Sequence, residues 1–139
     1  MILLDTSGLL SAIDGSQRQH AASAAALSRV QGPLLLSPFV LAELDYLLAT
    51  RVGAGAQRAL LEEVARGAYQ LEPFGAPDVT AALEVIDRYA DLRIGLADAS
   101  IVVLARRHGV RDVLTLDARH FRALRPSPRG RFRLLPQDP

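Results

Sequence analysis

Short apolar runs alternate along the chain with longer stretches in which apolar residues recur at the spacing of a helix. Ile2-Leu3-Leu4 and Leu34-Leu35-Leu36 are too short for helices and are typical of strands that are buried on both faces. The pattern predicts strands at residues 2–4, 34–36, 69–72, 112–116 and 132–135.

The longer stretches predict helices, and several of them carry recognisable end signals. Ser37-Pro38 supplies a cap followed by a proline at the first helical position, and Gly67 and Gly109 each follow a last turn. We expect helices from about Thr6 and over residues 19–30, 38–51, 56–66, 77–90, 96–108 and 119–124.

The regular alternation of strands and helices predicts an α/β fold. Neither an internal repeat nor an interdomain linker is visible, so residues 1–139 are expected to form one domain. We predict a three-layer α/β/α sandwich around a mostly parallel central sheet. Ligands of such sheets bind at the carboxyl ends of the strands, near the point where the strand order reverses.

Composition removes several functional classes. The chain has no cysteine, which excludes a disulfide framework, a thiolate metal site and a thiol nucleophile. The first residues do not read as a basic, apolar leader, so none is expected, and every apolar run is far shorter than the ~20 residues of a membrane span. We therefore expect a cytoplasmic protein without a membrane partner.

Charge is distributed unevenly along the chain. Residues 1–100 carry seven Arg and twelve acidic residues, a net charge of −5, whereas residues 101–139 carry nine Arg and three acidic residues, a net charge of +6. The chain has no Lys, and Arg suits bidentate contacts with phosphate. A coding bias towards Ala, Gly, Arg and Pro explains the lack of Lys equally well, but it does not explain the clustering of Arg.

Two acidic residues each end a predicted strand. Asp5 and Asp117 occupy the position from which a side chain reaches a ligand at the edge of a parallel sheet. Each also precedes a predicted helix, so a helix cap is an alternative role for both. Thr115 lies two residues before Asp117 and should point to the same face of its strand.

Two further acidic residues lie in predicted helices among apolar or small neighbours. Glu43 is spaced to border the buried stripe of its helix, whereas Asp45 lies about 200° away and cannot serve the same site. Asp98 is in a first turn, where the helix dipole favours a carboxylate whether or not a site is present.

Each of the four acids thus has a structural alternative, but together they predict a metal site. Converging carboxylates repel one another and raise each other's pKa. A hard divalent cation such as Mg²⁺ or Mn²⁺ relieves this repulsion, because it takes oxygen ligands, and it can activate water.

Other α/β functions fit the sequence less well. Receiver domains and P-loop proteins need a Lys, which the chain lacks, and a haloacid-dehalogenase-type phosphatase needs an Asp where Ser7 stands. Gly53-Ala54-Gly55 follows a helix and has Arg58 in place of the third glycine of a dinucleotide-binding motif. The histidines lack metal-ligand spacing and are expected at the surface or at helix ends: His20, His108 and His120.

Four short motifs resemble those of the PIN-domain nucleases: Asp5-Thr6-Ser7, Ala42-Glu43-Leu44, residues 96–99 and residues 115–121. Their order and spacing, and the length of the chain, are similar to those of the VapC toxins of toxin–antitoxin pairs. The resemblance implies a Mg²⁺- or Mn²⁺-dependent endoribonuclease in which an activated water attacks the phosphodiester.

The same resemblance implies roles and partners. Asp5 and Asp98 would bind the metal most directly. Glu43 and Asp117 would complete the acidic pocket, with Thr6 and Thr115 as polar supports. The partners would be a transfer or ribosomal RNA substrate, a VapB-type antitoxin that blocks the site, and a second copy of the chain in a homodimer. The nine Arg after residue 100 would be candidates for RNA contacts, and the alternative function is a non-catalytic PIN-like module that binds RNA or a protein.

Overall fold

Five short strands form one fully parallel sheet in the computed structural model, which describes residues 1–139. The central strand is β1 (Ile2–Leu4), where Leu3 pairs with Leu35 on one side and with Val113 on the other, and all three are fully buried. The other strands are β2 (Leu34–Leu36), β3 (Gln70–Leu71), β4 (Asp112–Leu114) and β5 (Arg133–Leu135). Burial on both faces explains why β1 and β2 read as continuous apolar runs, whereas both residues of the edge strand β3 are exposed.

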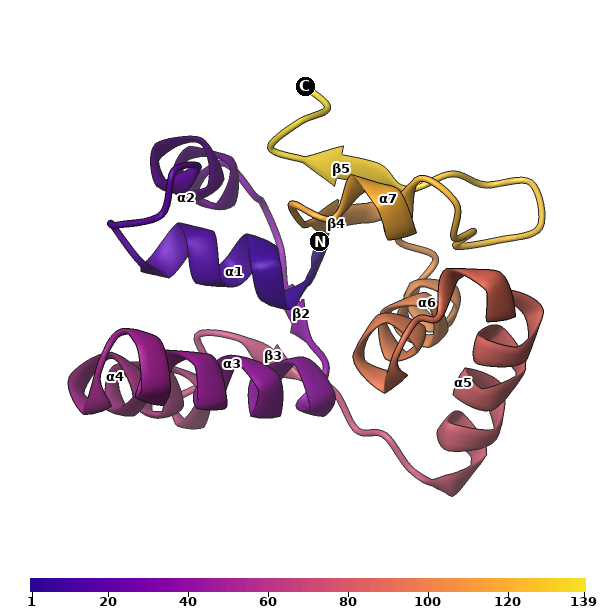
Figure 1. Ribbon diagram of the computed structural model, residues 1–139, viewed down its shortest axis with the longest axis horizontal. Helices are drawn as coiled ribbons and strands as arrows, with labels where there is room; N and C mark the ends of the chain where they lie inside the picture. Colours follow the sequence, from indigo (N-terminus) through magenta and orange to yellow (C-terminus); the bar gives the residue numbers. More distant parts are fainter.

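The helices are α1 (Thr6–Ile13), α2 (His20–Ser28), α3 (Pro38–Arg51), α4 (Ala54–Ala65), α5 (Ala76–Arg88), α6 (Leu96–His108) and α7 (Ala118–Phe121), with a short 3₁₀ turn η1 (Ala90–Leu92) that the sequence pattern does not predict. Helices α1 to α4 lie on one side of the sheet, and α5 and α6 lie on the other (Figure 1). The predicted three-layer α/β/α arrangement is confirmed, with a sheet that is parallel throughout. None of these helices has the length and apolar character needed to cross a membrane.

The strand order β3-β2-β1-β4-β5 reverses between β1 and β4. From β1 the chain moves outward through β2 to β3, and it then returns to place β4 and β5 on the opposite side of β1. The carboxyl ends of β1 and β4 therefore define the crevice in which ligands of open parallel sheets bind. Asp5 and Thr115 are the first residues after these two strands.

Strand β4 ends at Leu114, two residues before its predicted end. Thr115 still donates its backbone N–H to Leu135 O at 3.0 Å. The next two N–H groups turn to side-chain hydroxyls: Leu116 N donates to Ser7 Oγ and Asp117 N to Thr115 Oγ1, each at 2.9 Å. Hydroxyls thus replace a neighbouring strand as hydrogen-bond partners, and the chain leaves the sheet.

The outer edge of β5 is closed by the C-terminal segment. Leu134 directs its backbone groups away from β4, and both are bound by Asp138: Leu134 N donates to Asp138 Oδ2 at 2.9 Å, and Asp138 N donates to Leu134 O. Arg122 holds the same carboxylate through two hydrogen bonds of 2.6 and 2.7 Å.

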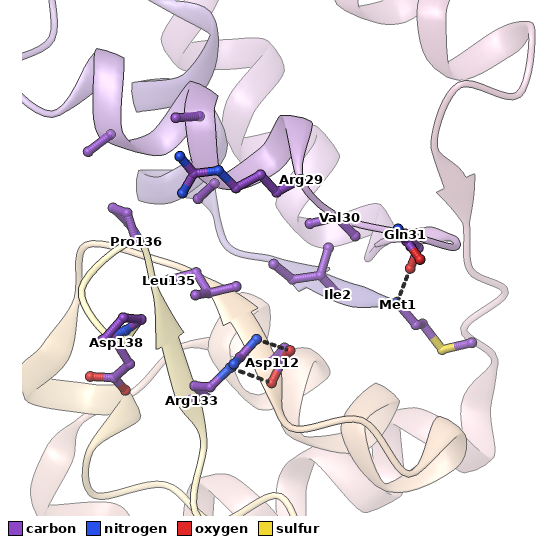
Figure 2. A pocket seen from close by; sticks show the side chains of 14 residues that line it. Met1, Ile2, Arg29, Val30, Gln31, Asp112, Arg133, Leu135, Pro136 and Asp138 are labelled. Carbon is purple, nitrogen blue, oxygen red and sulfur yellow. Dashed lines mark hydrogen bonds and ion pairs between the residues drawn. The ribbon is translucent and has the colours of Figure 1, made fainter.

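A hollow of about 620 Å³ lies between α2 and β5, beside the start of β1 (Figure 2). Its charged groups are largely engaged: Arg133 holds Asp112 through contacts of 3.1 and 2.8 Å, and the Met1 ammonium donates to Gln31 O at 2.7 Å. None of the four predicted acids lines it, so this hollow is separate from the predicted site.

Helix α1 packs closely on the end of β4 at Gly8. A Cβ atom at this position would lie 2.7 Å from Thr115 N and nearer still to the carbonyl group of Leu114. Gly8 therefore sets the distance between the helix that begins at the site and the strand that carries Thr115.

We expect Gly8→Ala to lower the free energy of unfolding by roughly 1–3 kcal/mol, because the added methyl group overpacks this contact. Gly55→Ala is the matched control, since Gly55 is also helical and a Cβ there meets nothing within 4 Å. That control should be neutral or stabilising by up to about 1 kcal/mol. Urea unfolding of both variants tests the contact, and equal effects at the two positions would contradict it.

Candidate active site

A pocket of about 370 Å³ opens at the carboxyl ends of β1 and β4. Residues of α1, α3 and α6 and of the segment after β4 form its wall. All four predicted acids line it, together with Thr6 and other residues: Asp5, Thr6, Ser7, Leu10, Glu43, Leu47, Arg51, Gly95, Ala97, Asp98, Asp117 and His120. The fold thus brings together side chains that are up to 112 positions apart, from Asp5 to Asp117.

The carboxylate of Asp5 is 5% exposed and is held by two hydroxyl groups. Its Oδ2 accepts a hydrogen bond from Thr115 Oγ1 at 2.6 Å and another from Ser7 Oγ at 2.8 Å. Each hydroxyl has one proton, and each oxygen in turn accepts a backbone N–H after β4. Asp5 occupies the N-cap position of α1, but its side chain makes no capping hydrogen bond, so capping does not account for its carboxylate.

Asp98 and Asp117 converge on one imidazole nitrogen. His120 Nδ1 lies 3.0 Å from Asp98 Oδ2 and 3.0 Å from Asp117 Oδ2. Asp117 also accepts the backbone N–H of His120 through Oδ1 at 3.1 Å, so it caps α7 while facing the pocket. For Asp117 the cap and the site are therefore compatible roles of one carboxylate.

His120 was absent from the predicted site, and its placement corrects the expectation that the histidines are surface or helix-end residues without metal-ligand spacing. The imidazole is 21% exposed and completes a group with Asp98 and Asp117 whose potential ligand atoms lie within 4.8 Å of one another. The signal in the sequence is the spacing Asp117-x-x-His120. This spacing places the His120 ring beside the Asp117 carboxylate, which caps the helix that carries His120. His108 instead ends α6 and pairs with the buried Glu72, outside the pocket.

Glu43 enters the pocket from the exposed face of α3, next to Leu47 one turn later. Asp45, the neighbouring acid on this helix, accepts a hydrogen bond from Gln57 Nε2 at 2.8 Å and does not line the pocket. The expectation that helical periodicity separates these two acids is confirmed.

Packing contacts outside the pocket place its helices. Ser37, which caps α3, lies 2.6 Å from Ser100 in the buried first half of α6, and Ser100 Oγ donates to Ala97 O at 2.6 Å. Phe121 of α7 is fully buried and packs edge-to-face on Phe132, with ring centroids 5.5 Å apart. These contacts fix the helix turns that carry Asp98 and His120.

Burial and mutual repulsion make the carboxylates costly to ionise. Burial raises the pKa of Asp98 to about 6, and the charges of Asp5 and Asp117 add to this effect, whereas His120 opposes it. Burial also raises the pKa of Asp5 above its ordinary value, despite the hydrogen bonds from Thr115 and Ser7. A cation at the pocket would stabilise the charged forms of both residues.

The residues present fit a divalent metal ion. The oxygen donors of Asp98 and Asp117, with the nearby His120 nitrogen, form a group compact enough to share one ion. Thr6 Oγ1 is buried in the pocket wall without a hydrogen-bond partner, an arrangement that a bound ion or its water would satisfy. The same group omits Asp5, so the assignment of Asp5 and Asp98 as the direct ligands stays a prediction.

Comparison with known proteins places this geometry in a family. Residues 2–125 match the PIN domain. The chain is 47% identical over 135 residues to the ribonuclease VapC26 of Mycobacterium tuberculosis, an alignment that covers 97% of this chain and all of that protein. The chain therefore belongs to the PIN-domain family and, within it, to the VapC ribonucleases.

Solved structures share the same fold. The structure of Mycobacterium tuberculosis VapC20, a sarcin–ricin-loop-cleaving toxin, matches with a TM-score of 0.79 at 21% identity, covering 84% of this chain and 90% of VapC20. FitAcB from Neisseria gonorrhoeae matches with a TM-score of 0.58 at 24% identity, covering 81% of this chain and 85% of that one. At these identities the likeness concerns the fold alone.

The raised pKa of Asp98 predicts a pH-dependent effect of Asp98→Asn on the metal-free protein. Folding lifts this pKa from 3.8 to about 6, so the unfolded chain loses the proton at lower pH than the folded chain does. Ionisation of Asp98 therefore lowers the free energy of unfolding of the wild-type protein as the pH rises from about 4 to 6, by up to roughly 2–3 kcal/mol. Asparagine, which stays neutral, should raise the free energy of unfolding at pH 7.5 and have little effect at pH 4.

Urea unfolding in EDTA at the two pH values measures this difference. Asp45→Asn serves as the control, because Asp45 lies on α3 outside the pocket. An Asp98→Asn effect of the same size at both pH values would contradict the assigned cost of ionisation.

Proposed function

We propose that this chain is a VapC-type endoribonuclease whose reaction takes place in the acidic pocket and depends on Mg²⁺ or Mn²⁺. The observation that carries the proposal is the convergence of Asp5, Glu43, Asp98 and Asp117 at the point where the strand order reverses. Membership of the VapC ribonucleases supports RNA as the substrate class. The complete set of acids argues against the alternative of a non-catalytic binding module.

The residues in and beside the pocket would have different roles in binding the metal ion. Asp98 and Asp5 would hold the ion most directly, Asp117 and Glu43 complete its acidic surroundings, and Thr6 and Thr115 support them. When bound, the ion lowers the pKa of water and stabilises negative charge on the phosphoryl oxygens. Thr115 fixes one oxygen of Asp5 by hydrogen bonding, and so orients the carboxylate towards the pocket.

The pocket would also receive the attacking water, the RNA and the antitoxin. Glu43 is exposed on α3 and lines the pocket, a position suited to orienting the attacking water. We expect the substrate to be a transfer RNA or a ribosomal RNA. A VapB-type antitoxin would act by covering this pocket.

We expect wild-type protein to cleave RNA with Mg²⁺ or Mn²⁺ and to lose cleavage in EDTA. Asp5→Asn and Asp98→Asn should each reduce cleavage by at least ~100-fold, because each removes a charged oxygen ligand. Asp45→Asn, on the same chain but outside the pocket, should cleave normally. Mapping the cut ends in total RNA measures activity and identifies the substrate.

Cleavage that persists in EDTA would contradict the metal mechanism. Full activity of both Asp5→Asn and Asp98→Asn, with folding verified by circular dichroism, would contradict the site. Binding of RNA without any cleavage under all metal conditions would favour the non-catalytic alternative.

We further propose that the chain forms a homodimer through α5. Val79 and Leu83 are one helical turn apart on this helix, and their exposed fractions of 45% and 55% are high for apolar residues. We expect a mass of twice 15.0 kDa by light scattering, and a monomer for Leu83→Glu. Leu61→Glu, an exposed leucine on α4, is the control that should stay dimeric. A wild-type monomer at all concentrations, or an unaffected Leu83→Glu dimer, would contradict this interface.

A further inference from the structure

The acidic pocket contains one arginine, Arg51, which lies in the last turn of α3. It shares a face of this helix with Glu43 and Leu47, since the three are spaced four residues apart and all line the pocket. At a rise of ~1.5 Å per residue, Arg51 lies ~12 Å along the helix from Glu43. The pocket face of α3 therefore carries an acid, Glu43, in the body of the helix and a cation, Arg51, in its last turn.

The guanidinium of Arg51 is exposed and takes part in no ion pair. Several other arginines are engaged internally: Arg107 with Glu72 and Asp78, Arg122 with Asp138, and Arg133 with Asp112. None of the nine Arg after residue 100 lines the pocket. The basic C-terminal third thus supplies no arginine to the wall of the pocket, whereas α3 supplies Arg51.

A polyanion approaching four carboxylates meets repulsion along its whole length, and the metal ion can offset it only at one phosphate. A second cation in the pocket wall, at the end of α3, would hold the strand by a neighbouring phosphate, and Arg offers a planar, bidentate donor for this purpose. The dipole of α3 also favours a cation at its C-terminal end. That effect accounts for a basic residue in the last turn, but not for its position in the pocket wall.

We propose that Arg51 binds a backbone phosphate of the RNA that flanks the scissile phosphate, and so sets the position of the strand across the acids. This inference rests on the proposed ribonuclease function and names a substrate contact for it. The contact is made equally in the ground and transition states, because the flanking phosphate does not react. Its loss should therefore raise KM and leave kcat nearly unchanged.

The test compares Arg51→Ala with Arg88→Ala, the matched control. Arg88 is also exposed, unpaired and in the last turn of a helix, α5, but it lies outside the pocket. Binding of a labelled single-stranded oligoribonucleotide is measured with Mg²⁺ in an Asp98→Asn background, which prevents cleavage, over a range of salt concentrations. Kinetics are measured without that background.

Arg51→Ala should raise the Kd about tenfold at low salt and reduce the slope of log K against log salt by ~0.7, the value for one phosphate contact on a single strand. Arg51→Lys should keep the slope. Arg88→Ala should change neither quantity, and Mg²⁺ should raise the Tm of Arg51→Ala protein as much as that of wild type.

An unchanged salt slope and KM in Arg51→Ala, with wild type active, would overturn the assignment of Arg51 and leave the proposed function intact. A fall in kcat at unchanged KM would overturn the flanking position, because it would place Arg51 on the reacting phosphate. Wild-type protein that neither binds nor cleaves RNA would instead overturn the proposed function itself.

Discussion

The buried carboxylate of Asp5 is the constraint on which the arrangement of the site depends. A charged group at the centre of the sheet is tolerated only if its oxygens are hydrogen-bonded or paired with a cation. Ser7 and Thr115 supply two hydrogen bonds to one oxygen, and their own oxygens bind the backbone of the segment after β4. This network ties the end of β1 to the end of β4, so the geometry of the pocket and the path of the chain out of the sheet have the same cause.

Burial has a second consequence for the pocket. The same desolvation that raises the pKa of Asp98 makes a bound cation more favourable there than at an exposed acidic cluster. The core supplies the free energy that holds these acids together before any ion binds, since Leu3, Leu4, Val113 and Leu114 are fully buried around them. The metal-free pocket is therefore a strained electrostatic arrangement that the remainder of the fold supports.

Much of this organisation could be predicted from the sequence because it depends on local patterns. Short apolar runs predicted the central strands β1 and β2, and the predicted strand ends placed Asp5 and Asp117 at the same edge of the sheet, although β4 ends at Leu114. Helical periodicity separated Glu43 from Asp45. The contribution of His120 could not be predicted in this way, because it depends on how Phe121 packs a four-residue helix against Phe132.

The distribution of charge also required the structure. The sequence places nine Arg after residue 100, but Arg107, Arg122 and Arg133 are engaged with acidic residues and are not free for RNA. Arg51 comes from the acidic part of the chain, and it lines the pocket because it lies on the same face of α3 as Glu43 and Leu47. The net charge of a segment therefore does not show which charged side chains contact a substrate, because their positions depend on the tertiary structure.

The C-terminal segment has a consequence for association between molecules. An open strand edge is a template on which another chain can add a strand, and such edges promote aggregation. Here Asp138 occupies both backbone groups of Leu134 that would receive an added strand, and the opposite edge, β3, is only two residues long. The sheet therefore offers little backbone to another extended chain, and recognition between proteins falls to side chains on the helices that cover it.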